Sequence, residues 1–330
     1  MDRKLQLEAW LQQVLNNEPF TLTTASADAS FRRYFRVHTA NRTLIAMDAP
    51  PPQEDCRPFV RIAKLLLTAG LNVPEIVAED VEHGFLLLSD LGDTTYLSVL
   101  NAENATSLYG DATLALIKMQ LASQSDTLPP YDEALLSREM QLFPDWYLAK
   151  HLEVTLNDAQ VAVLQQTFAL LNQNIVAQPK VTVHRDYHSR NLMVCDNNPG
   201  VLDFQDAVYG PITYDLVSLL KDAYIAWDEE QTIDWVARYW QSAKKAGLPV
   251  SLDFGEFYRD FEWMGAQRHI KVLGIFARLY HRDSKDGYLK DMPLVMEYLR
   301  KVCGRYVELK PMLKLLNALE GLEDKAGFTF

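Results

Sequence analysis

The sequence predicts an α+β protein of two lobes, a small N-terminal lobe with an antiparallel sheet at residues 1–90 and a larger, mainly helical lobe at residues 91–330. Three observations lead to this prediction. The chain of 330 residues is too long for one small core. Strand patterns dominate before residue 90, and helical patterns dominate from Thr94 onward. A short island rich in strand patterns, at residues 180–205, interrupts the helices.

The N-terminal lobe begins with an amphipathic helix pattern in "MDRKLQLEAWLQQVLN". Strands are expected between Phe20 and Pro50, because "FRRYFRVHT" alternates aromatic and basic residues and "RTLIAMDAP" is a short apolar run. The three prolines at residues 50–52 cannot continue a strand. The next segment, "EDCRPFVRIAKLLLTAGL", predicts a helix with acidic residues at its start, an apolar face and Gly70 at its end.

Two more strands are expected in "EIVAEDVEHGFLLLSDLGD", on either side of the polar turn "EDVEHG". The boundary between the lobes is expected near "LLLSDLGD", where strands give way to helices. Beyond it, long helices extend to about residue 317, without an internal repeat or a low-complexity linker.

The overall charge argues against nucleic acid as a partner. The formal net charge is −12, with 32 basic and 44 acidic residues, whereas phosphate backbones are bound by clustered Lys and Arg. A nucleotide ligand is compatible with this charge, because Mg²⁺ can bridge acidic side chains to phosphates. The chain is 48% hydrophobic and 23% charged, as expected for a folded globular protein.

Targeting features predict a cytoplasmic protein. The N-terminal pattern lacks the unbroken apolar core of a signal peptide, and no apolar run approaches the ~20 residues of a membrane span. The three cysteines, Cys56, Cys195 and Cys303, are far apart and have no C-x-x-C spacing, which favours neither a disulfide framework nor a zinc site. We therefore expect a reducing compartment and no membrane partner.

The stretch "VTVHRDYHSRNLMV", residues 181–194, concentrates polar side chains that can carry chemistry. Three interpretations compete for it: a polar surface turn, a His-x-Asp-x-His metal site, and the catalytic loop of a phosphotransferase. Val181 and Val183 alternate as in a strand that ends at His184. "NLMVC" and "GVLDF" predict two further strands, joined by a turn at residues 196–199.

This turn brings Asn191 and Asp203 to the same end of a hairpin. For a turn centred on the bond between residues 197 and 198, residue 191 lies opposite residue 204, next to Asp203.

Phosphoryl transfer requires a carboxylate that orients the attacking hydroxyl and a Mg²⁺ ion that bridges the nucleotide phosphates, and Mg²⁺ prefers the oxygen ligands of Asp and Asn. We therefore assign Asp186 as the catalytic base or orienter, Asn191 and Asp203 as metal ligands, and ATP with Mg²⁺ as cofactors.

The pattern H-x-D-x-H-x-x-N, formed by His184, Asp186, His188 and Asn191, is followed by Asp203-Phe204. It resembles the catalytic motif of the aminoglycoside phosphotransferase and choline kinase group, within the bilobal protein-kinase-like fold. Protein kinases usually have a lysine two positions after the catalytic aspartate, where this chain has a histidine, as small-molecule kinases do. The resemblance extends through "DFQDAVYGPITYDLVSLL" to Asp215, and it implies that His184 and Asp215 form the scaffold of the catalytic loop.

Four segments, "SADASFRRYFRV", "LIAMDAPP", "HRDYHSRNLMV" and "FQDAVYGPITYDLVSLLKDAY", carry a closer resemblance. Together they are similar to bacterial kinases that phosphorylate the anomeric (C1) hydroxyl of N-acetylmuramate and N-acetylglucosamine. The resemblance covers both lobes and implies an ATP-dependent phosphotransferase with an alcohol acceptor, active in peptidoglycan recycling. A small amino sugar is then the expected partner, and no protein partner is implied.

The nucleotide-binding half departs from the family pattern at two places. The turn "SADASFRRYF" has no glycine, so backbone N–H groups and Ser30 would bind the phosphates, with Arg32 or Arg33 nearby. The strand that usually carries a nucleotide-binding lysine has Met47 or Asp48 at that position, and an arginine of "FRRYFR" is the candidate replacement. Adenine is expected at the backbone of Leu88, Ser89, Asp90 and Leu91.

Seven side chains are candidate substrate contacts: Arg185, His188, Arg190, Gln205, Asp206, Arg268 and Lys271. Plainer interpretations compete with some of these roles. His188 is favoured as a structural histidine, and a solvent-exposed helical face is the favoured explanation for the basic residues 268–271 in "WMGAQRHIKVLGIFARL". For Asp215, an ordinary carboxylate in the first turn of a helix fits the pattern as well as a scaffold role does.

Other functions compete with the kinase assignment. A non-haem iron site fits His184-x-Asp186, but it leaves Asn191 and Asp203 unexplained and expects a double-stranded β-helix, so we reject it. A kinase for another small hydroxyl compound, such as an aminoglycoside or an amino alcohol, stays open. A catalytically silent nucleotide- or sugar-binding module also stays open, because the usual lysine is missing, although a binding module needs no catalytic base.

Overall fold

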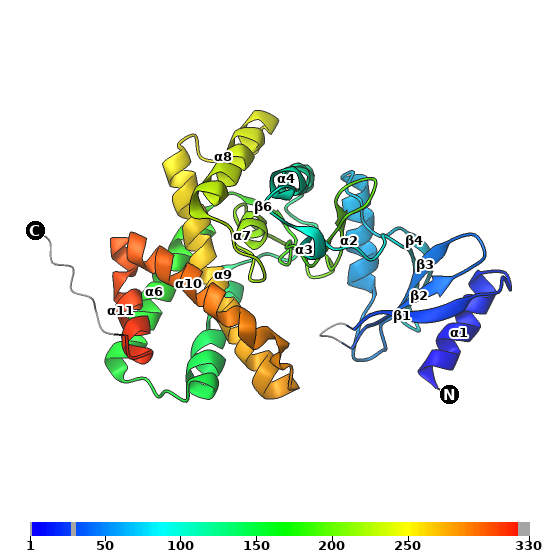
Figure 1. Cartoon of the computed structure of the whole chain (residues 1–330), viewed down its shortest axis with the longest axis horizontal. Helices are drawn as coiled ribbons and strands as arrows, with labels where there is room; N and C mark the ends of the chain where they lie inside the picture. Colours follow the sequence, from blue (N-terminus) through cyan, green and yellow to red (C-terminus); the bar gives the residue numbers. More distant parts are fainter. Residues whose placement is uncertain (1, 28–30, 323–330) are drawn as a thin grey trace, which may run out of the picture. The chain divides into compact units, whose positions relative to one another are not determined.

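The computed structural model describes residues 2–27 and 31–322, which form two compact units (Figure 1). The first unit comprises the described residues up to 119 together with 190–207, and the second comprises 120–189 together with the described residues from 208 onward. The predicted α+β class is confirmed, with an N-terminal antiparallel sheet and a mainly helical C-terminal region.

The first unit is built on a five-stranded antiparallel sheet with the strand order β1-β2-β3-β5-β4. Its strands are β1 Thr21–Ala27, β2 Arg33–His38, β3 Thr43–Asp48, β4 Ile76–Asp80 and β5 Phe85–Ser89. Its helices are α1 Arg3–Val14, α2 Arg57–Thr68, α3 Tyr96–Val99 and α4 Ala105–Leu121. The last two residues of α4 belong to the second unit. The strands and the two helices predicted before residue 90 are confirmed.

Helix α1 packs against the sheet of the first unit, as Figure 1 shows at the blue end of the chain. Asp2 begins the helix by accepting the N–H of Lys4 at 3.1 Å. The apolar face of α1 then enters a buried cluster with the sheet, and burial of each such leucine contributes about 1.5–3 kcal/mol. This cluster contains Leu7, Leu11, Leu15, Val37, Leu44, Ala46, Phe85 and Leu87.

The predicted hairpin after the histidine-rich loop is present in the first unit, as β7 Leu192–Met193 and β8 Gly200–Val201. Its register differs from the prediction, because Leu192 lies opposite Val201 and the turn is centred one residue earlier than expected. The reason is tertiary: Val194 donates its N–H to the Thr94 carbonyl, and Val201 donates to the Asn72 carbonyl, each at 2.8 Å. These bonds to distant segments set the register, and local turn propensity could not show them.

The second unit is mainly helical. Its helices are α5 Glu133–Met140, the π-helix η1 Phe143–His151, α6 Asp158–Ala177, α7 Tyr214–Leu220, α8 Glu229–Ala246, α9 Phe254–Asp283, the 3₁₀ helix η2 Asp286–Asp291, α10 Met292–Arg305, the 3₁₀ helix η3 Val307–Leu309 and α11 Lys310–Leu319. Across the described residues, no helix combines the length and the apolar character that crossing a membrane requires.

Two strands accompany these helices, β6 Lys180–Val183 and β9 Val208–Pro211, and they pair antiparallel. The sequence predicted β6 but not β9. The reason is that β9 reads "VYGP", and glycine and proline are depleted in strands. Its pairing with the buried β6 overrides this weak local propensity.

The 30-residue helix α9 is the central element of the second unit and contacts α5, α6, α7, α10 and η1 (Figure 1). A close approach between α9 and the start of η1 occurs at Gly274. A Cβ atom at this position would lie 2.4 Å from the carbonyl carbon of Leu142, closer than real Cβ atoms come to backbone. Only glycine therefore fits here without movement of one element.

We predict opposite stability effects for the same substitution at two helical glycines. Gly274→Ala should destabilise the protein by about 1–3 kcal/mol, because the new methyl group overlaps the Leu142 backbone. Gly110→Ala, on the exposed face of α4 with open space around it, should stabilise by about 0.5–1 kcal/mol through helix propensity. Thermal and urea unfolding measure both, and destabilisation by both substitutions, or by neither, would contradict the packing described for α9.

Candidate active site

The histidine-rich loop begins where β6 ends. Strand β6 pairs with β9 over all of its residues, and Val181 and Val183 are buried, so the strand leads into a buried His184. The next residue, Arg185, has a left-handed backbone with φ of 79°. A non-glycine residue in this region is uncommon and persists where its surroundings hold it.

Asp215 holds the loop in this conformation. Its carboxylate, in the first turn of α7 and 1% exposed, accepts the N–H of His184 at 2.6 Å and that of Arg185 at 3.0 Å. Burial raises the pKa of Asp215 to about 7, with a smaller contribution from the charge of Asp186, although the two N–H bonds oppose the rise. Asp215 is a carboxylate in the first turn of a helix, as one interpretation expected, and it also binds the backbone of the loop.

A second buried carboxylate, Asp222, holds the other end of the loop. It accepts the N–H of Ser189 at 3.0 Å and also the Ser189 hydroxyl. The loop of residues 184–189 is thus fixed at both ends by acidic side chains that follow β9. No role was predicted for Asp222 from the sequence, where its place directly after an apolar helix was the available signal.

Asp186 lies between these two anchors and is ionised by its neighbours. Its backbone N–H donates to Nδ1 of the buried His184 at 3.2 Å. Burial alone would raise the pKa of the Asp186 carboxyl, but the charges of Lys271, His188 and Arg268 outweigh it, and the pKa lies below its ordinary value. An ionised carboxylate can accept a hydrogen bond from a substrate hydroxyl, as a base or orienter must.

Glu139 of α5, which was not predicted from the sequence, links two of the surrounding cations. Its carboxylate pairs with the Arg185 guanidinium, lies 3.0 Å from the Lys271 ammonium and accepts the hydroxyl of Tyr131. Lys271 also donates to the Tyr214 hydroxyl at 2.8 Å. No sequence signal pointed to Glu139, because it lies 46 residues from Arg185 and in no motif.

The favoured sequence interpretation of Arg268, His269 and Lys271 as a solvent-exposed face of α9 is wrong. All three residues are buried, with exposed fractions of 6%, 2% and 6%. The error arises because α9 is surrounded by other helices, so its polar residues face protein on more than one side. The charges of Arg268 and Lys271 act on Asp186, whereas burial lowers the pKa of His269 well below its ordinary value.

The ring of His188, the second histidine of the motif, lies edge-on to that of Tyr224, with 5.5 Å between ring centres. Its charge also contributes to the low pKa of Asp186. The packing of the His188 ring on Tyr224 supports the structural role that the sequence favoured. The effect of His188 on Asp186 shows that it also lies near the predicted base, where a substrate contact was the alternative.

In the first unit, Asn191 and Asp203 lie together at one end of the β7–β8 hairpin, as the spacing predicted. The Asn191 amide nitrogen lies 3.4 Å from an Asp203 carboxylate oxygen, and the Leu202 N–H donates to the Asn191 carbonyl at 2.9 Å. Asp203 has a left-handed backbone with φ of 63°, a second unusual conformation at a predicted functional residue. Gln205 donates to the Asp203 carboxylate at 2.7 Å, and Asp206 is exposed beside it.

These residues fit a magnesium ion better than a transition metal. Asn191 and Asp203 present an amide and a carboxylate oxygen, which are hard ligands, and Mg²⁺ usually takes one or two protein carboxylates and completes its shell with water and phosphate oxygens. Within the described ranges, no group of three or more His, Cys, Asp or Glu side chains could hold a metal by itself. The donor set therefore suits a cation that arrives with a nucleotide.

Arg32, Arg33 and Arg36, which lie in or next to β2, have different partners. Arg33 is paired with Asp48, whose other oxygen accepts from Arg3 at 2.9 Å. Arg36 makes a two-pronged pair with Asp90, at 2.7 and 3.2 Å. The Arg32 guanidinium is the one of these three near Asp203, at 3.8 Å, and it lies 3.9 Å from Glu54.

The residues predicted to contact adenine lie at the end of β5 and directly after it. Leu88 and Ser89 lie in β5, which is paired on both sides, and the Ser89 N–H donates to the Glu75 carbonyl at 2.9 Å. Asp90 and Leu91 follow the end of this strand, where backbone groups are no longer committed to the sheet. Ser30 lies outside the described residues. Arg190 begins the hairpin segment of the first unit.

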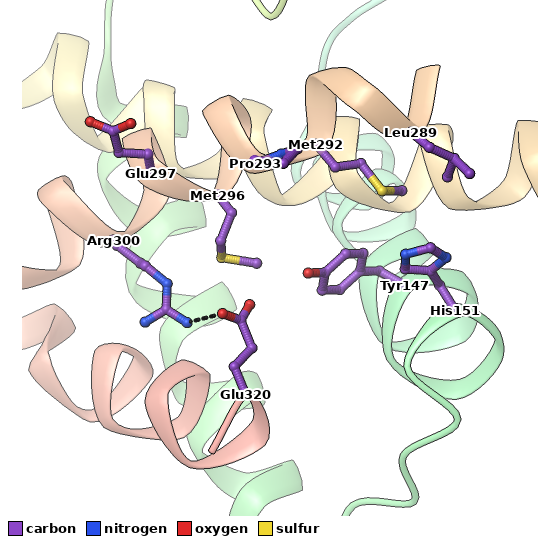
Figure 2. A pocket seen from close by; sticks show the side chains of 9 residues that line it. All are labelled: Tyr147, His151, Leu289, Met292, Pro293, Met296, Glu297, Arg300 and Glu320. Atoms are coloured by element: carbon purple, nitrogen blue, oxygen red, sulfur yellow. Dashed lines mark ion pairs between the residues drawn. The ribbon is translucent and has the colours of Figure 1, made fainter. Parts of the chain in front are cut away.

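A separate cavity of about 420 Å³ lies in the second unit, between α10 and η1 (Figure 2). Figure 2 shows Met292 and Met296 of α10 opposite Tyr147 and His151 of η1. At one end, the Arg300 guanidinium pairs with Glu320 at 2.8 Å and donates to the Leu316 carbonyl at 3.2 Å. None of the predicted site residues lines this cavity, and its arginine is already bound by protein groups.

The phosphotransferase enzyme family matches this chain over residues 21–253. The chain is 50% identical over 328 residues to the N-acetylmuramate/N-acetylglucosamine kinase of Pseudomonas putida, covering 96% of this chain and 97% of that protein. Two solved structures show the same fold. One is the choline kinase LicA from Streptococcus pneumoniae, with a TM-score of 0.66, 11% identity and coverage of 91% of this chain and 100% of that chain. The other is the aminoglycoside phosphotransferase APH(2'')-Ib with bound ADP, with a TM-score of 0.56, 15% identity and coverage of 92% and 99%.

We predict that Asp215→Asn changes how stability depends on pH. The pKa of Asp215 is raised in the folded protein from about 3.8 to about 7, so the folded state binds this proton more tightly than the unfolded chain. The contribution of Asp215 to stability is then largest below about pH 4 and is lost as pH rises through about 7. The asparagine variant lacks this titration, so its stability deficit should shrink between about pH 4.5 and about pH 8, by on the order of 2 kcal/mol.

Urea unfolding of wild type and variant across this pH range measures the difference. Asp234→Asn is the matched control, because Asp234 is an exposed carboxylate of α8 that pairs with Arg238. A deficit for Asp215→Asn that stays constant, or grows, with rising pH would show that the Asp215 pKa is not raised.

Proposed function

Since this chain belongs to the phosphotransferase enzyme family, we propose that it transfers the γ-phosphoryl group of ATP to the anomeric hydroxyl of N-acetylmuramate and N-acetylglucosamine. The observation that carries this proposal is the 50% identity, over nearly the full length of both chains, to a kinase named for these two sugars. The geometry of the loop around Asp186 supports it. We propose that the enzyme acts in the cytoplasm, where ATP is available.

Asp186 is the residue that orients and deprotonates the acceptor. Its ionised carboxylate accepts a hydrogen bond from the C1 hydroxyl of the sugar, whose oxygen then forms a bond to the γ-phosphorus. The bond from that phosphorus to the β–γ bridging oxygen breaks, ADP leaves, and the hydroxyl proton passes to Asp186. Asp215 and Asp222 contribute by fixing the loop backbone, so the carboxylate need not reorganise during the reaction.

Asn191 and Asp203 would hold Mg²⁺. When bound, this ion neutralises charge on the β- and γ-phosphates. The left-handed backbone of Asp203 and the hydrogen bond from Gln205 keep the carboxylate at the end of the hairpin beside Asn191. Adenine would contact the backbone of Asp90 and Leu91.

Arg32 is the residue that we propose in place of the missing nucleotide-binding lysine. Arg33 and Arg36 are each bound to an aspartate other than the proposed metal ligand, whereas the Arg32 guanidinium lies 3.8 Å from the Asp203 carboxylate. A guanidinium beside a metal ligand is within reach of phosphates bound to the ion, and it can bind them with two hydrogen bonds. Its neighbour Asp203, as a metal ligand, keeps it near the triphosphate.

The buried cations of α9 bear on the choice among possible acceptors. Lys271 is paired with Glu139, whereas Arg268 forms no ion pair with a carboxylate within the described ranges, so one cation of α9 is left for an acceptor. A neutral or acidic sugar suits this cation better than a polycationic aminoglycoside or an amino alcohol does. This charge supports the amino sugars over the cationic alternatives, and the ionised Asp186 argues against a silent binding module.

We predict that Asp186→Ala abolishes turnover without unfolding the protein. Loss of the orienting base should lower kcat by at least about 10²–10⁴-fold with either sugar. The assay mixes purified protein with ATP, Mg²⁺ and N-acetylmuramate or N-acetylglucosamine, and follows ADP release together with the sugar 1-phosphate by ³¹P NMR. Circular dichroism checks that the variant is folded.

Asp234→Ala serves as the control for this experiment, because it removes an exposed carboxylate of the same unit and should leave turnover unchanged. Full activity of Asp186→Ala would overturn the assignment of the base. Failure of the wild-type enzyme to phosphorylate either sugar, with activity on another hydroxyl compound, would overturn the proposed acceptor.

We predict that nucleotide affinity depends on Asp203 and Arg32 in different ways. Asp203→Ala should bind ATP with the same affinity whether or not Mg²⁺ is present, because a ligand of the ion is gone. Arg32→Met should bind ATP about 10-fold more weakly under both conditions, because a phosphate contact is gone. Titration calorimetry with and without Mg²⁺ measures both effects.

Arg42→Met provides the matched control, because Arg42 is an exposed arginine of the same unit in the turn between β2 and β3. Its ATP affinity should equal that of the wild type. An unchanged response to Mg²⁺ in Asp203→Ala, or unchanged ATP affinity in Arg32→Met, would remove the corresponding residue from the nucleotide site.

A further inference from the structure

Arg268 is a buried cation that forms no ion pair with a carboxylate among the described residues, although the charges of Asp186 and Asp222 act on it and help to raise its pKa. It lies on α9, is 6% exposed, and donates from Nε to the Ser218 hydroxyl at 2.6 Å. Its guanidinium also lies over the ring of Tyr214, 5.8 Å from the ring centre. These contacts orient the side chain, but neither of them supplies a negative charge.

Two other cations of this unit, Arg185 and Lys271, are neutralised by the protein itself. Arg185 and Lys271 share the carboxylate of Glu139, and Lys271 has a further bond to the Tyr214 hydroxyl. The remaining nearby carboxylate, Asp222, accepts from the N–H and hydroxyl of Ser189 and from the N–H of Tyr224. Arg268 is thus held by its Nε bond to Ser218, and no ion pair to a carboxylate involves its two terminal nitrogens within the described residues.

A buried charge without a hydrogen-bonded counterion is costly, and charged residues in protein interiors are normally paired. Where a folded protein keeps such a cation beside a reaction site, an anionic ligand can provide the missing partner. Arginine suits this role because its planar fork binds a carboxylate with two parallel hydrogen bonds.

We propose that Arg268 binds the carboxylate of N-acetylmuramate. This inference rests on the proposed function, which takes two acceptors of the same ring type. N-acetylmuramate carries a carboxylate on its lactyl ether, and N-acetylglucosamine has a hydroxyl at that position and no charge. Arg268 is then the residue that distinguishes the two sugars, and it leaves the transfer chemistry to Asp186.

The position of Arg268 along α9 agrees with this role. Arg268 and Lys271 lie three residues apart on α9, and both approach the ring of Tyr214, at 5.8 and 5.4 Å from its centre. Lys271 also acts on the charge of Asp186, where the acceptor hydroxyl belongs. The lactyl ether is attached at C3, two ring carbons from the anomeric carbon, so the acceptor hydroxyl and the lactyl carboxylate can contact neighbouring side chains of one site.

The competing explanation is that Arg268 only stabilises the charge of Asp186. The two roles predict different kinetics, because a change at Asp186 affects both sugars equally, whereas a lost carboxylate contact affects only the acidic one. The pair of substrates therefore acts as an internal control within each enzyme variant.

The experiment measures kcat and KM for both sugars at saturating ATP and Mg²⁺. Arg268→Met should raise KM for N-acetylmuramate by about 10- to 100-fold, the effect of a hydrogen bond to a charged group, and should change KM for N-acetylglucosamine by no more than about 2-fold. Arg268→Lys, which keeps the charge but loses the fork, should fall between. Arg259→Met makes the same chemical change at an exposed position of the same helix and should leave both sugars unaffected.

A second arm needs no mutation. The methyl ester of N-acetylmuramate lacks the negative charge, so the wild-type enzyme should bind it about as weakly as Arg268→Met binds the acid. Arg268→Met should bind the ester with the same affinity as the wild-type enzyme does, since the esterification and the substitution remove the same interaction.

Equal losses for both sugars, or no loss for either, would overturn the role of Arg268 while leaving the kinase activity established. Full affinity of the wild-type enzyme for the ester would do the same. A wild-type enzyme that phosphorylates neither sugar would overturn the proposed function, and the inference about Arg268 with it.

Discussion

The candidate active site depends on one buried interaction, in which the carboxylate of Asp215 accepts the backbone N–H groups of His184 and Arg185. These two bonds hold Arg185 in a left-handed conformation that a non-glycine residue would otherwise leave. They determine where the chain is directed after β6 and therefore where Asp186 points. The raised pKa of Asp215 reflects the cost of burying this carboxylate, which the folded structure bears in order to fix the loop.

The charges around Asp186 follow from that constraint. A second buried carboxylate near Asp215 would favour protonation of both, so Asp186 stays ionised only because cations surround it. Glu139 in turn balances two of these cations, Arg185 and Lys271, and so prevents a concentration of uncompensated positive charge in the interior. Positive and negative groups thus alternate through the site, and each lowers the free-energy cost of burying its oppositely charged neighbour.

Local features of the site could be predicted from the sequence, and long-range ones could not. Asn191 and Asp203 were expected together because a hairpin has a strict period and a turn with a strong sequence signal. The pairing of Glu139 with Lys271 has no such signal, because it depends on how α5 packs against α9. The burial of Arg268 escaped prediction for the same reason: α9 is enclosed by helices from several parts of the chain, and periodicity cannot reveal which of its faces are covered.

The strand that usually carries the nucleotide-binding lysine ends here in an aspartate, and this change affects the roles of the neighbouring arginines. Asp48 lies at the end of β3, at one of the two positions, with Met47, where that lysine is expected, and it is fully buried. A buried carboxylate must be paired, and Arg3 of α1 and Arg33 of β2 both bind it. These pairs give Arg3 and Arg33 structural roles, which argues against Arg33 as a phosphate contact. We propose that the positive charge for the triphosphate comes from outside this pair, from Arg32, which is next in the chain and lies 3.8 Å from Asp203.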